Sequence, residues 1–175
     1  MRNVILFIAM SLDGYIADRE GKVGWLSGQS DDGEMIDTYG EFAAQVDTVV
    51  MGWNTYDQII TELSPEEWVY KGMTCHVITH RDCPSTEMIR FTDEHPGSLI
   101  RDLRKQEGKD IWICGGAEIV RQLMAENLID IYYISVIPVL LGSGIRLFGG
   151  NEEAIPLRLV KTLSYNGITE LVYER

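Results

Sequence analysis

The sequence has little positive charge, few cysteines and no long apolar run. Lys and Arg number 15 against 27 Asp and Glu, which gives a formal net charge of −12 at pH 7. A chain this acidic repels nucleic-acid backbones and anionic membrane surfaces, so we expect neither nucleic acid nor a membrane among its partners. A phosphate-bearing ligand must then be held by local donors rather than by a broad basic surface.

The three cysteines, Cys75, Cys83 and Cys114, form neither a CxxC spacing nor a pattern with nearby histidines. An odd number of unpatterned cysteines indicates reduced thiols, which are typical of cytoplasmic proteins. We therefore expect a cytoplasmic protein without a zinc site or another metal site.

Two apolar stretches are too short to cross a bilayer. Val4–Met10 runs directly into Asp13-Gly14 without a convincing signal-peptide cleavage site. Ile131–Leu141 falls well short of the roughly 20 residues needed for a span, and Pro138 interrupts it. We interpret both as strands and expect no transmembrane segment.

The chain has 175 residues, of which 45% are hydrophobic, and this is enough to bury the core of one domain. We find no internal repeat, low-complexity tract or linker that would divide it. The sequence therefore predicts a single domain over residues 1–175.

Apolar runs of strand length alternate with apolar stripes at helical spacing. The runs predict buried strands covered by helices on both faces, and they are Val4–Met10, Thr48–Met51, His76–Thr79 and Ile111–Cys114. Helical stripes follow Pro96 (Leu99, Ile100, Leu103) and Gly116 (Ile119, Val120, Leu123, Met124). A third stripe, after an acidic first turn, lies between Ser30 and Val46 and contains Met35, Ile36, Tyr39, Phe42 and Ala43.

The pattern changes after Asp130. Ile131–Val139 is strand-like, and Leu157–Leu163 and Ile168–Tyr173 read as a hairpin joined at Asn166-Gly167. The whole predicts an α/β fold: a doubly wound, mostly parallel sheet flanked by helices, with antiparallel C-terminal strands. Ligands are expected outside the carboxyl ends of the parallel strands.

The segment from Ile111 to Glu118 stops a strand on two glycines and restarts as a helix. Without a Cβ, Gly115 and Gly116 let the backbone approach a diphosphate, which the N–H groups of the next helix would face. Ordinary turn chemistry is the alternative reading of the same residues.

A second strand-to-helix joint lies at Met51–Tyr56. Gly52 permits close approach, while Asn54 and Thr55 can donate to phosphate oxygens at the helix start. The alternative is a simple helix N-cap, which Asn and Thr also favour.

A hydroxyl, an imidazole and a guanidinium follow the strand that ends near Ile78. Thr79, His80 and Arg81 would stand at the ligand-binding edge of the sheet, where they could clamp a 2′-phosphate. The alternative is a solvated loop.

Taken together, the segments resemble the dihydrofolate-reductase-like superfamily, especially the reductase domain of the bifunctional riboflavin-biosynthesis enzymes and its free-standing relatives. The resemblance spans nearly the whole chain. Ser11–Ala17 is similar to the family's Ser-Leu-Asp-Gly-x-Ile-Ala segment, and Pro138–Gly144, followed by Phe148, is similar to its Pro-x-Leu-Leu-Gly-x-Gly turn.

The resemblance implies that the chain binds NADPH. It implies that Ile16 and Ala17 lie beside the nicotinamide and that Gly52 and Thr55 lie beside the diphosphate. The further cofactor contacts that it implies are Ala9, Gly115, Gly116, Ala117, Glu118 and Ile119.

Three residues depart from the family pattern. Trp53 stands where an Arg usually contacts the 2′-phosphate, so this task shifts to His80 and Arg81 or the preference for NADPH over NADH weakens. Phe7 and Cys114 stand where the riboflavin-pathway reductases carry a Lys and a Glu associated with their phosphoribosyl substrate.

Dihydrofolate reductases use one buried carboxylate near the start of the first long helix to assist protonation. The position of this carboxylate in the chain can be counted from two residues that match the family. Counting forward from Trp25, which resembles the family's tryptophan, leads to Asp31 and Asp32, whereas counting back from Gly52 leads to Asp37. These three are the candidate catalytic acids. The alternative for each is a charged helix start that faces water.

The sequence therefore predicts an NADPH-dependent reductase that passes a hydride to a small heterocyclic or glycosylamine substrate. The resemblance offers 5-amino-6-(5-phosphoribosylamino)uracil as the substrate, with dihydrofolate as the alternative. A nucleotide-binding module of the same fold without turnover is a third interpretation. We also expect a homodimer, because Ile131–Val139 and the closing hairpin offer apolar surface.

Overall fold

The computed structural model describes residues 1–150 and 153–175. Within these residues eight strands form one sheet, and two short strands form a separate pair. The strands of the sheet are β1 (Val4–Ser11), β3 (Val46–Gly52), β4 (Thr74–Ile78), β5 (Ile89–Thr92), β6 (Asp110–Gly115), β7 (Ile131–Ile137), β9 (Arg158–Tyr165) and β10 (Ile168–Glu174). The pair consists of β2 (Tyr15–Ala17) and β8 (Ile145–Arg146).

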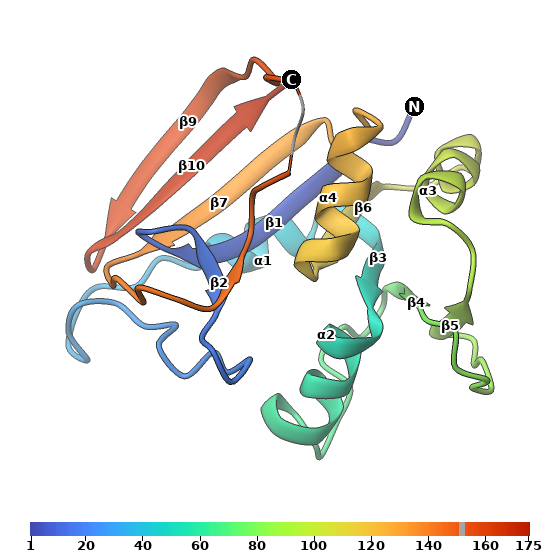
Figure 1. The fold of residues 1–175 in the computed structure, drawn as a ribbon, viewed down its shortest axis with the longest axis horizontal. Coiled ribbons are helices and arrows are strands. Elements are labelled where there is room, and N and C mark those ends of the chain that lie inside the picture. The colour runs from blue at the N-terminus through green and yellow to red at the C-terminus, as the bar shows by residue number, and fades with distance from the viewer. Residues whose placement is uncertain (151–152) are drawn as a thin grey trace.

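The sheet has the order β5-β4-β3-β6-β1-β7-β10-β9, so the first strand of the chain lies inside it (Figure 1). The pairings from β5 through β7 are parallel, and β10 pairs antiparallel with both β7 and β9. This confirms the predicted mostly parallel sheet with antiparallel C-terminal strands. The strands β2, β5 and β8 were not predicted, because two to four residues are too few to show a period.

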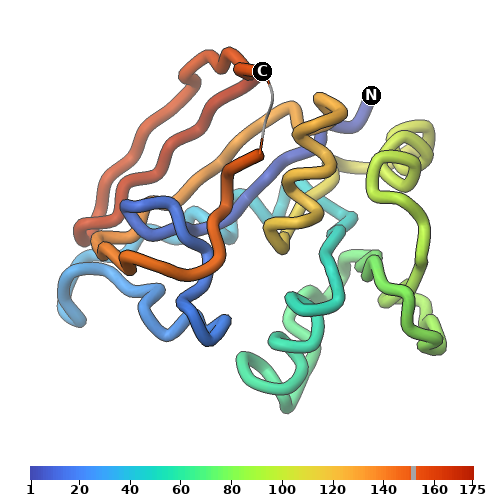
Figure 2. Tube along the Cα trace, viewed as in Figure 1, coloured from blue at the N-terminus to red at the C-terminus, as the bar shows by residue number. Residues whose placement is uncertain are grey.

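Helices cover both faces of the sheet. They are α1 (Thr38–Ala43), α2 (Trp53–Gln58) continued by the π-helical turn η1 (Ile59–Leu63), α3 (Pro96–Lys105) and α4 (Ala117–Ala125). Alternate residues of β1 enter different cores: Leu6 packs with residues of α3 and α4, and Ile5 packs with Phe42 of α1 and Ile59 of η1. The chain path in Figure 2 follows this alternation of strands and helices, and the predicted doubly wound arrangement is confirmed.

The third predicted helix is shorter than the apolar stripe suggested. Only Thr38–Ala43 is helical, and Met35 and Ile36 lie in the preceding loop with exposed fractions of 60% and 38%. Asp37 caps the helix by accepting a hydrogen bond from the Gly40 N–H, at 2.8 Å. Asn166 binds the loop further upstream, donating to the Ser30 carbonyl oxygen at 2.9 Å. These side-chain hydrogen bonds compete with an earlier helix start.

Candidate functional site

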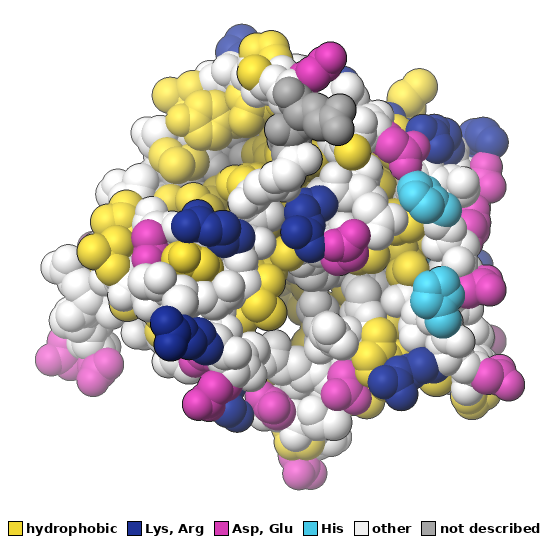
Figure 3. All heavy atoms as spheres, in the orientation of Figure 1, with side chains coloured by type: hydrophobic (Ala, Val, Ile, Leu, Met, Phe, Trp, Pro, Cys, Tyr) yellow, Lys and Arg dark blue, Asp and Glu magenta, His cyan; other side chains and the backbone are white. Residues whose placement is uncertain are grey.

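A cavity of about 770 Å³ opens at the carboxyl ends of the parallel strands. β1 and β6 are paired from Val4–Leu6 to Ile111–Ile113 and then separate, and β1 continues along β7. The Trp112 indole N–H donates to the Phe7 carbonyl oxygen at 2.9 Å where the two strands part. Figure 3 shows the surface hollowed at this place, between β2 and α2. The crevice lies where a fold of this kind places its ligand.

Two helix N-termini meet at the cavity. Gly52 is the N-cap of α2 and Gly116 is the N-cap of α4, and in the described part of the chain neither terminus is capped by a side chain. A Cβ on Gly52 would lie 3.9 Å from the Gly116 nitrogen and 3.4 Å from Cγ1 of Ile119, so the glycine keeps the space between the two termini open. Uncapped N–H groups and the positive ends of two helix dipoles are suited to bind a diphosphate.

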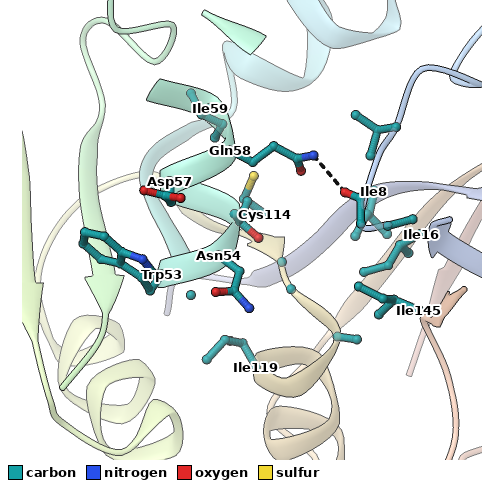
Figure 4. A pocket seen from close by; sticks show the side chains of 18 of the residues that line it. Ile8, Ile16, Trp53, Asn54, Asp57, Gln58, Ile59, Cys114, Ile119 and Ile145 are labelled. Carbon is teal, nitrogen blue, oxygen red and sulfur yellow. Dashed lines mark hydrogen bonds between the residues drawn. The ribbon is translucent and has the colours of Figure 1, made fainter. Parts of the chain in front are cut away.

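Side-chain donors supplement these amides. The side chain of Asn54 extends toward the cavity from the first turn of α2 (Figure 4). The Thr55 hydroxyl oxygen lies 3.5 Å from where a Cβ of Gly116 would be. Gly115 adopts φ = +133°, a backbone conformation that favours glycine. The predicted cofactor residues of β3, α2, β6 and α4 are thus brought together around one cavity.

The opposite wall of the cavity is built from the two segments that carry the family resemblance, residues 11–17 and 138–148. Ile16 and Ala17 of β2 line the cavity together with Ile145 of β8. β2 and β8 pair antiparallel, Tyr15 with Arg146 and Ala17 with Ile145. A Cβ on Gly144 would come within 2.1 Å of the Ala17 carbonyl oxygen, so only glycine permits this close approach.

Asp13 holds these two segments together. Its carboxyl group accepts hydrogen bonds from the Ser11 hydroxyl at 2.6 Å, the Leu141 N–H at 3.1 Å and the Gly142 N–H at 2.7 Å. The Ser11 hydroxyl is the main cause that lowers the pKa of Asp13 to about 2, and the two backbone donors add to it. The carboxylate therefore stays ionised at neutral pH and links the two turns.

Beyond the glycines the cavity becomes apolar. Cys114 and Tyr70 form part of its wall, with the Tyr70 hydroxyl 3.5 Å from the Cys114 Sγ. Burial raises the pKa of Cys114 to about 11, so the side chain is a neutral thiol at physiological pH. Gln58 of α2 donates to the Gly21 carbonyl oxygen at 2.9 Å and so ties the helix to the loop after β2 (Figure 4).

A second, smaller cavity of about 370 Å³ lies beside the first and is lined by Thr79, His80 and Arg81. The Arg81 guanidinium lies over the ring of Trp53, which lines the main cavity, so the two cavities adjoin. Thr79 is buried, and its hydroxyl accepts from the Arg81 N–H at 3.1 Å. Thr79 therefore shapes the loop, while His80 and Arg81 are exposed.

The structure does not bring the three candidate acids to the cavity. Asp31 and Asp32 are exposed in the loop before α1, and Asp37 serves as the N-cap of that helix. All three lie outside the cavity wall formed by the described residues. Their alternative interpretation, charged residues at a helix start, fits these positions; a role as proton donor stays a prediction.

A buried carboxyl group on β10 was not among the residues predicted from the sequence. The Glu170 side chain is 1% exposed and accepts hydrogen bonds from Thr38 at 2.7 Å, Tyr133 at 2.5 Å and Tyr165 at 2.6 Å. Tyr133 in turn packs edge-on against Phe7, with ring centroids 4.8 Å apart. The group thus joins α1 to three strands. Alternation along β10 predicts a strand but not which polar residue faces inward.

Other residues of the cavity wall also lay outside the sequence-based candidates. Among them are Val23, Gln58, Ile59, Leu63, Tyr70 and Ile145. They come from loops, from η1 and from the short strand β8, and no motif marks them. Among the described residues no cluster of His, Cys, Asp and Glu could hold a metal ion, and no helix is long and apolar enough to cross a membrane.

A mostly parallel sheet of this order, with two uncapped helix N-termini at its carboxyl edge, defines a protein of the dihydrofolate-reductase-like fold. The dihydrofolate reductase of Enterococcus faecalis, solved with NADP(H), superposes with a TM-score of 0.70 at 17% identity, over 99% of this chain and 96% of that one. Within that fold, the chain belongs to the RibD C-terminal domain family, which matches residues 2–170.

Two relatives are similar over nearly their whole length. The uncharacterized protein YwjB of Bacillus subtilis (strain 168) is 38% identical over 180 residues, which cover 99% of this chain and 98% of YwjB. A putative riboflavin biosynthesis protein from Shewanella sp. PV-4 is 30% identical with a TM-score of 0.85, over 99% of this chain and 98% of that one. The predicted resemblance to riboflavin-type reductases is confirmed at the level of the family.

Proposed function

We propose that the protein is an NADPH-dependent reductase that transfers a hydride to a small heterocyclic or glycosylamine substrate. The observation that carries the proposal is the pair of uncapped helix N-termini at Gly52 and Gly116, held close together at the edge of a cavity of about 770 Å³. Such a pair can grip a diphosphate from two sides. In a chain with a net charge of −12, local donors of this kind are what an anionic cofactor requires.

The residues present fit the parts of the cofactor. The main-chain N–H groups at Gly116 and Gly52 and the side chains of Asn54 and Thr55 would hold the diphosphate. Ile16 and Ala17, which line the same cavity, would support one face of the nicotinamide, as the family resemblance implies. Ala9, Ala117, Glu118 and Ile119 also line this cavity.

The 2′-phosphate would lie in the adjoining cavity. Arg81 can form charge-assisted hydrogen bonds with it, and His80 adds a second donor. Trp53 stands where the family usually has an Arg that contacts the 2′-phosphate. Its aromatic ring instead packs against the Arg81 guanidinium and fixes the position of that group. This arrangement supports NADPH rather than NADH as the cofactor.

When bound, the reduced nicotinamide supplies the hydride. The protein orients donor and acceptor. The reduced substrate also takes up one proton. Since Asp31, Asp32 and Asp37 lie outside the cavity wall, we propose water as the proton source.

Titration calorimetry with NADPH, followed by an absorbance assay of its oxidation, tests the proposal. The acceptors are 5-amino-6-(5-phosphoribosylamino)uracil and dihydrofolate, the two substrates that the resemblance offers. Binding of NADPH with oxidation in the presence of an acceptor supports a reductase. Binding without oxidation across a wider pterin and pyrimidine panel supports a nucleotide-binding module instead, and absence of binding overturns the proposal.

A further inference from the structure

We propose that the apolar end of the cavity, the part beside Cys114 and Tyr70, binds an uncharged, planar, conjugated acceptor without a phosphate group. The Tyr70 hydroxyl donates a hydrogen bond to the carbonyl oxygen or ring nitrogen of this acceptor. The inference rests on the proposed function, because it concerns the partner of the hydride donor. This acceptor differs from the phosphoribosyl substrate that the family resemblance implies, because it carries no phosphate group.

The Tyr70 ring is held in place from two sides. It packs edge-on against Trp112, with centroids 4.9 Å apart, and against Trp68, with centroids 5.4 Å apart. The hydroxyl of this fixed ring reaches the cavity wall beside Cys114. A side chain so constrained loses little conformational entropy when it binds a ligand.

The hydroxyl is weakly satisfied within the protein. Its hydrogen-bond partner among the described residues is the Cys114 Sγ at 3.5 Å, and a thiol is both a weak donor and a weak acceptor. Buried tyrosine hydroxyls normally have a stronger partner. The remaining capacity of the Tyr70 hydroxyl is therefore available to a ligand in the cavity.

The Tyr70 hydroxyl and the Cys114 thiol are both neutral. Burial is the main cause that raises the pKa of the Tyr70 hydroxyl, with the Cys114 sulfur nearby adding to it. Tyr70 therefore remains a donor at physiological pH, and Cys114 remains a thiol. Neither group offers a charge that would compensate an anionic substrate.

Positive charge is scarce among the residues that line the cavity. Among the described residues that line it, Arg121 is the one cationic side chain, and it forms an ion pair with Glu118 on α4, at the end assigned to the diphosphate. Asp57 and Glu62 add negative charge to the wall. Phosphate groups are usually bound by Arg or Lys or by helix N-termini, and here the proposed cofactor would use both. Lys22, which lies between the lining residues Gly21 and Val23, is exposed and is not itself among the described lining residues.

The apolar wall favours a flat acceptor. Ile8, Ile16, Val23, Leu26 and Ile59 line the same cavity as Tyr70 and Cys114. In the reaction the hydride of NADPH, with its two electrons, forms a C–H bond at the acceptor carbon while the π bond of C=N or C=O breaks. The nitrogen or oxygen takes a proton from water, and NADP⁺ is the second product. Tyr70 positions the heteroatom and is not consumed.

Two acceptor-like probes that differ in one group test the charge argument: 5-amino-6-ribosylaminouracil and its 5′-phosphate. Calorimetry measures the affinity of each for the NADP⁺ complex of the protein. We expect the unphosphorylated probe to bind at least as tightly as the phosphorylated one. A tenfold preference for the phosphorylated probe, or no binding of either to an intact NADP⁺ complex, overturns the inference and leaves the cofactor proposal standing. A protein that binds neither NADPH nor NADP⁺ overturns the cofactor proposal itself.

The variant Tyr70→Phe tests the hydrogen bond, because it keeps the ring between Trp112 and Trp68. We expect its affinity for the unphosphorylated probe to fall about tenfold, the magnitude typical of one hydrogen bond, with unchanged NADPH affinity. Tyr39→Phe is the matched control: the Tyr39 ring also packs against Trp112, at 6.0 Å, but lies outside the cavity wall. Equal losses in both variants, or no loss in Tyr70→Phe, contradict the role of Tyr70. Thermal unfolding midpoints show whether either variant is impaired in folding.

Discussion

The guanidinium carbon of Arg81 lies 4.6 Å from the centroid of the Trp53 ring. This contact joins two segments that are separate in the sequence, the start of α2 and the loop after β4. It offers a positive charge with fixed orientation at the place where the proposed 2′-phosphate would lie. The proposed cofactor preference would therefore depend on a pair of residues rather than on one arginine.

Replacing Arg81 should abolish the preference for the phosphorylated cofactor. We expect Arg81→Ala to raise the KM for NADPH by about 10- to 100-fold, the value of one or two charge-assisted hydrogen bonds, and to leave the KM for NADH unchanged. Trp53→Leu keeps the charge but removes its support, so its effect should be only a few-fold. Steady-state kinetics with both cofactors measure these values; an equal rise for NADH in Arg81→Ala would contradict the assignment.

The space at Gly52 should matter for cofactor affinity. Gly52 has φ = −83°, which any residue adopts, and a Cβ there would make ordinary contact with Ile119. We expect Gly52→Ala to fold normally and to bind NADPH at least about tenfold more weakly, because the methyl group enters the gap between the two helix N-termini. Gly24→Ala is the control, since its Cβ would meet nothing within 4 Å. Calorimetry and thermal unfolding on both variants separate affinity from stability.

The link through Asp13 should depend on pH. Since its pKa in the folded protein is lowered to about 2, its stabilising effect is full above roughly pH 4, the ordinary value for Asp, and is lost as the pH falls through about 2. Asp13→Asn should therefore lower the thermal midpoint at pH 7, and the difference from the wild type should shrink between pH 5 and pH 2. Calorimetric scans across this range measure it, and a constant difference would refute the assigned ionisation.

The buried carboxyl group of Glu170 should contribute strongly to stability. In Glu170→Leu the hydroxyls of Thr38, Tyr133 and Tyr165 lose their shared acceptor inside the protein. We expect the free energy of unfolding to fall by about 2–4 kcal/mol. Glu170→Gln, which retains one carbonyl oxygen, should lose less. Denaturant titration measures both, and equal losses would show that packing rather than hydrogen bonding dominates.

The predicted homodimer can be tested at the edge of the sheet. β9 is an edge strand, and Leu159 and Val160, at an irregularity in the pairing of β9 with β10, are 52% and 51% exposed. An edge strand with exposed apolar residues can pair with a strand of another chain. We expect sedimentation at micromolar concentration to show a dimer and Val160→Lys to shift it toward monomer. A wild-type protein that sediments only as monomer contradicts the prediction.

The sequence predicted the parallel strands well because they are buried on both faces. Val4–Leu6 and Ile111–Ile113 are continuous apolar runs for this reason, and β1 and β6 lie where the runs are. The helix before β3 was predicted too long, since Asp37 and Asn166 make hydrogen bonds that periodicity does not register. Pattern rules describe burial better than they describe competing local hydrogen bonds.

The candidate site was predictable where its chemistry depends on the main chain. Gly52, Gly115 and Gly116 stood out in the sequence because each stands where a strand gives way to a helix, and the same pattern also fits ordinary turns. Tyr70 could not be found in this way. It lies on a loop, and its neighbour Cys114 is 44 residues further along the chain. Contacts over such distances follow from the packing of the sheet and carry no local signature.

The hydrogen bonds from Leu141 and Gly142 to Asp13 span more than 120 residues of sequence. A hybrid gene made from this protein and a relative such as YwjB, with its junction anywhere between residues 18 and 137, would take one of these turns from each parent. In such hybrids the two turns come from different parents, and their hydrogen bonds to each other need not form. Exchanging residues 11–17 and 138–148 together keeps two turns that already bind each other in one parent. Laboratory recombination of this fold should therefore treat the two loops as a single inherited unit.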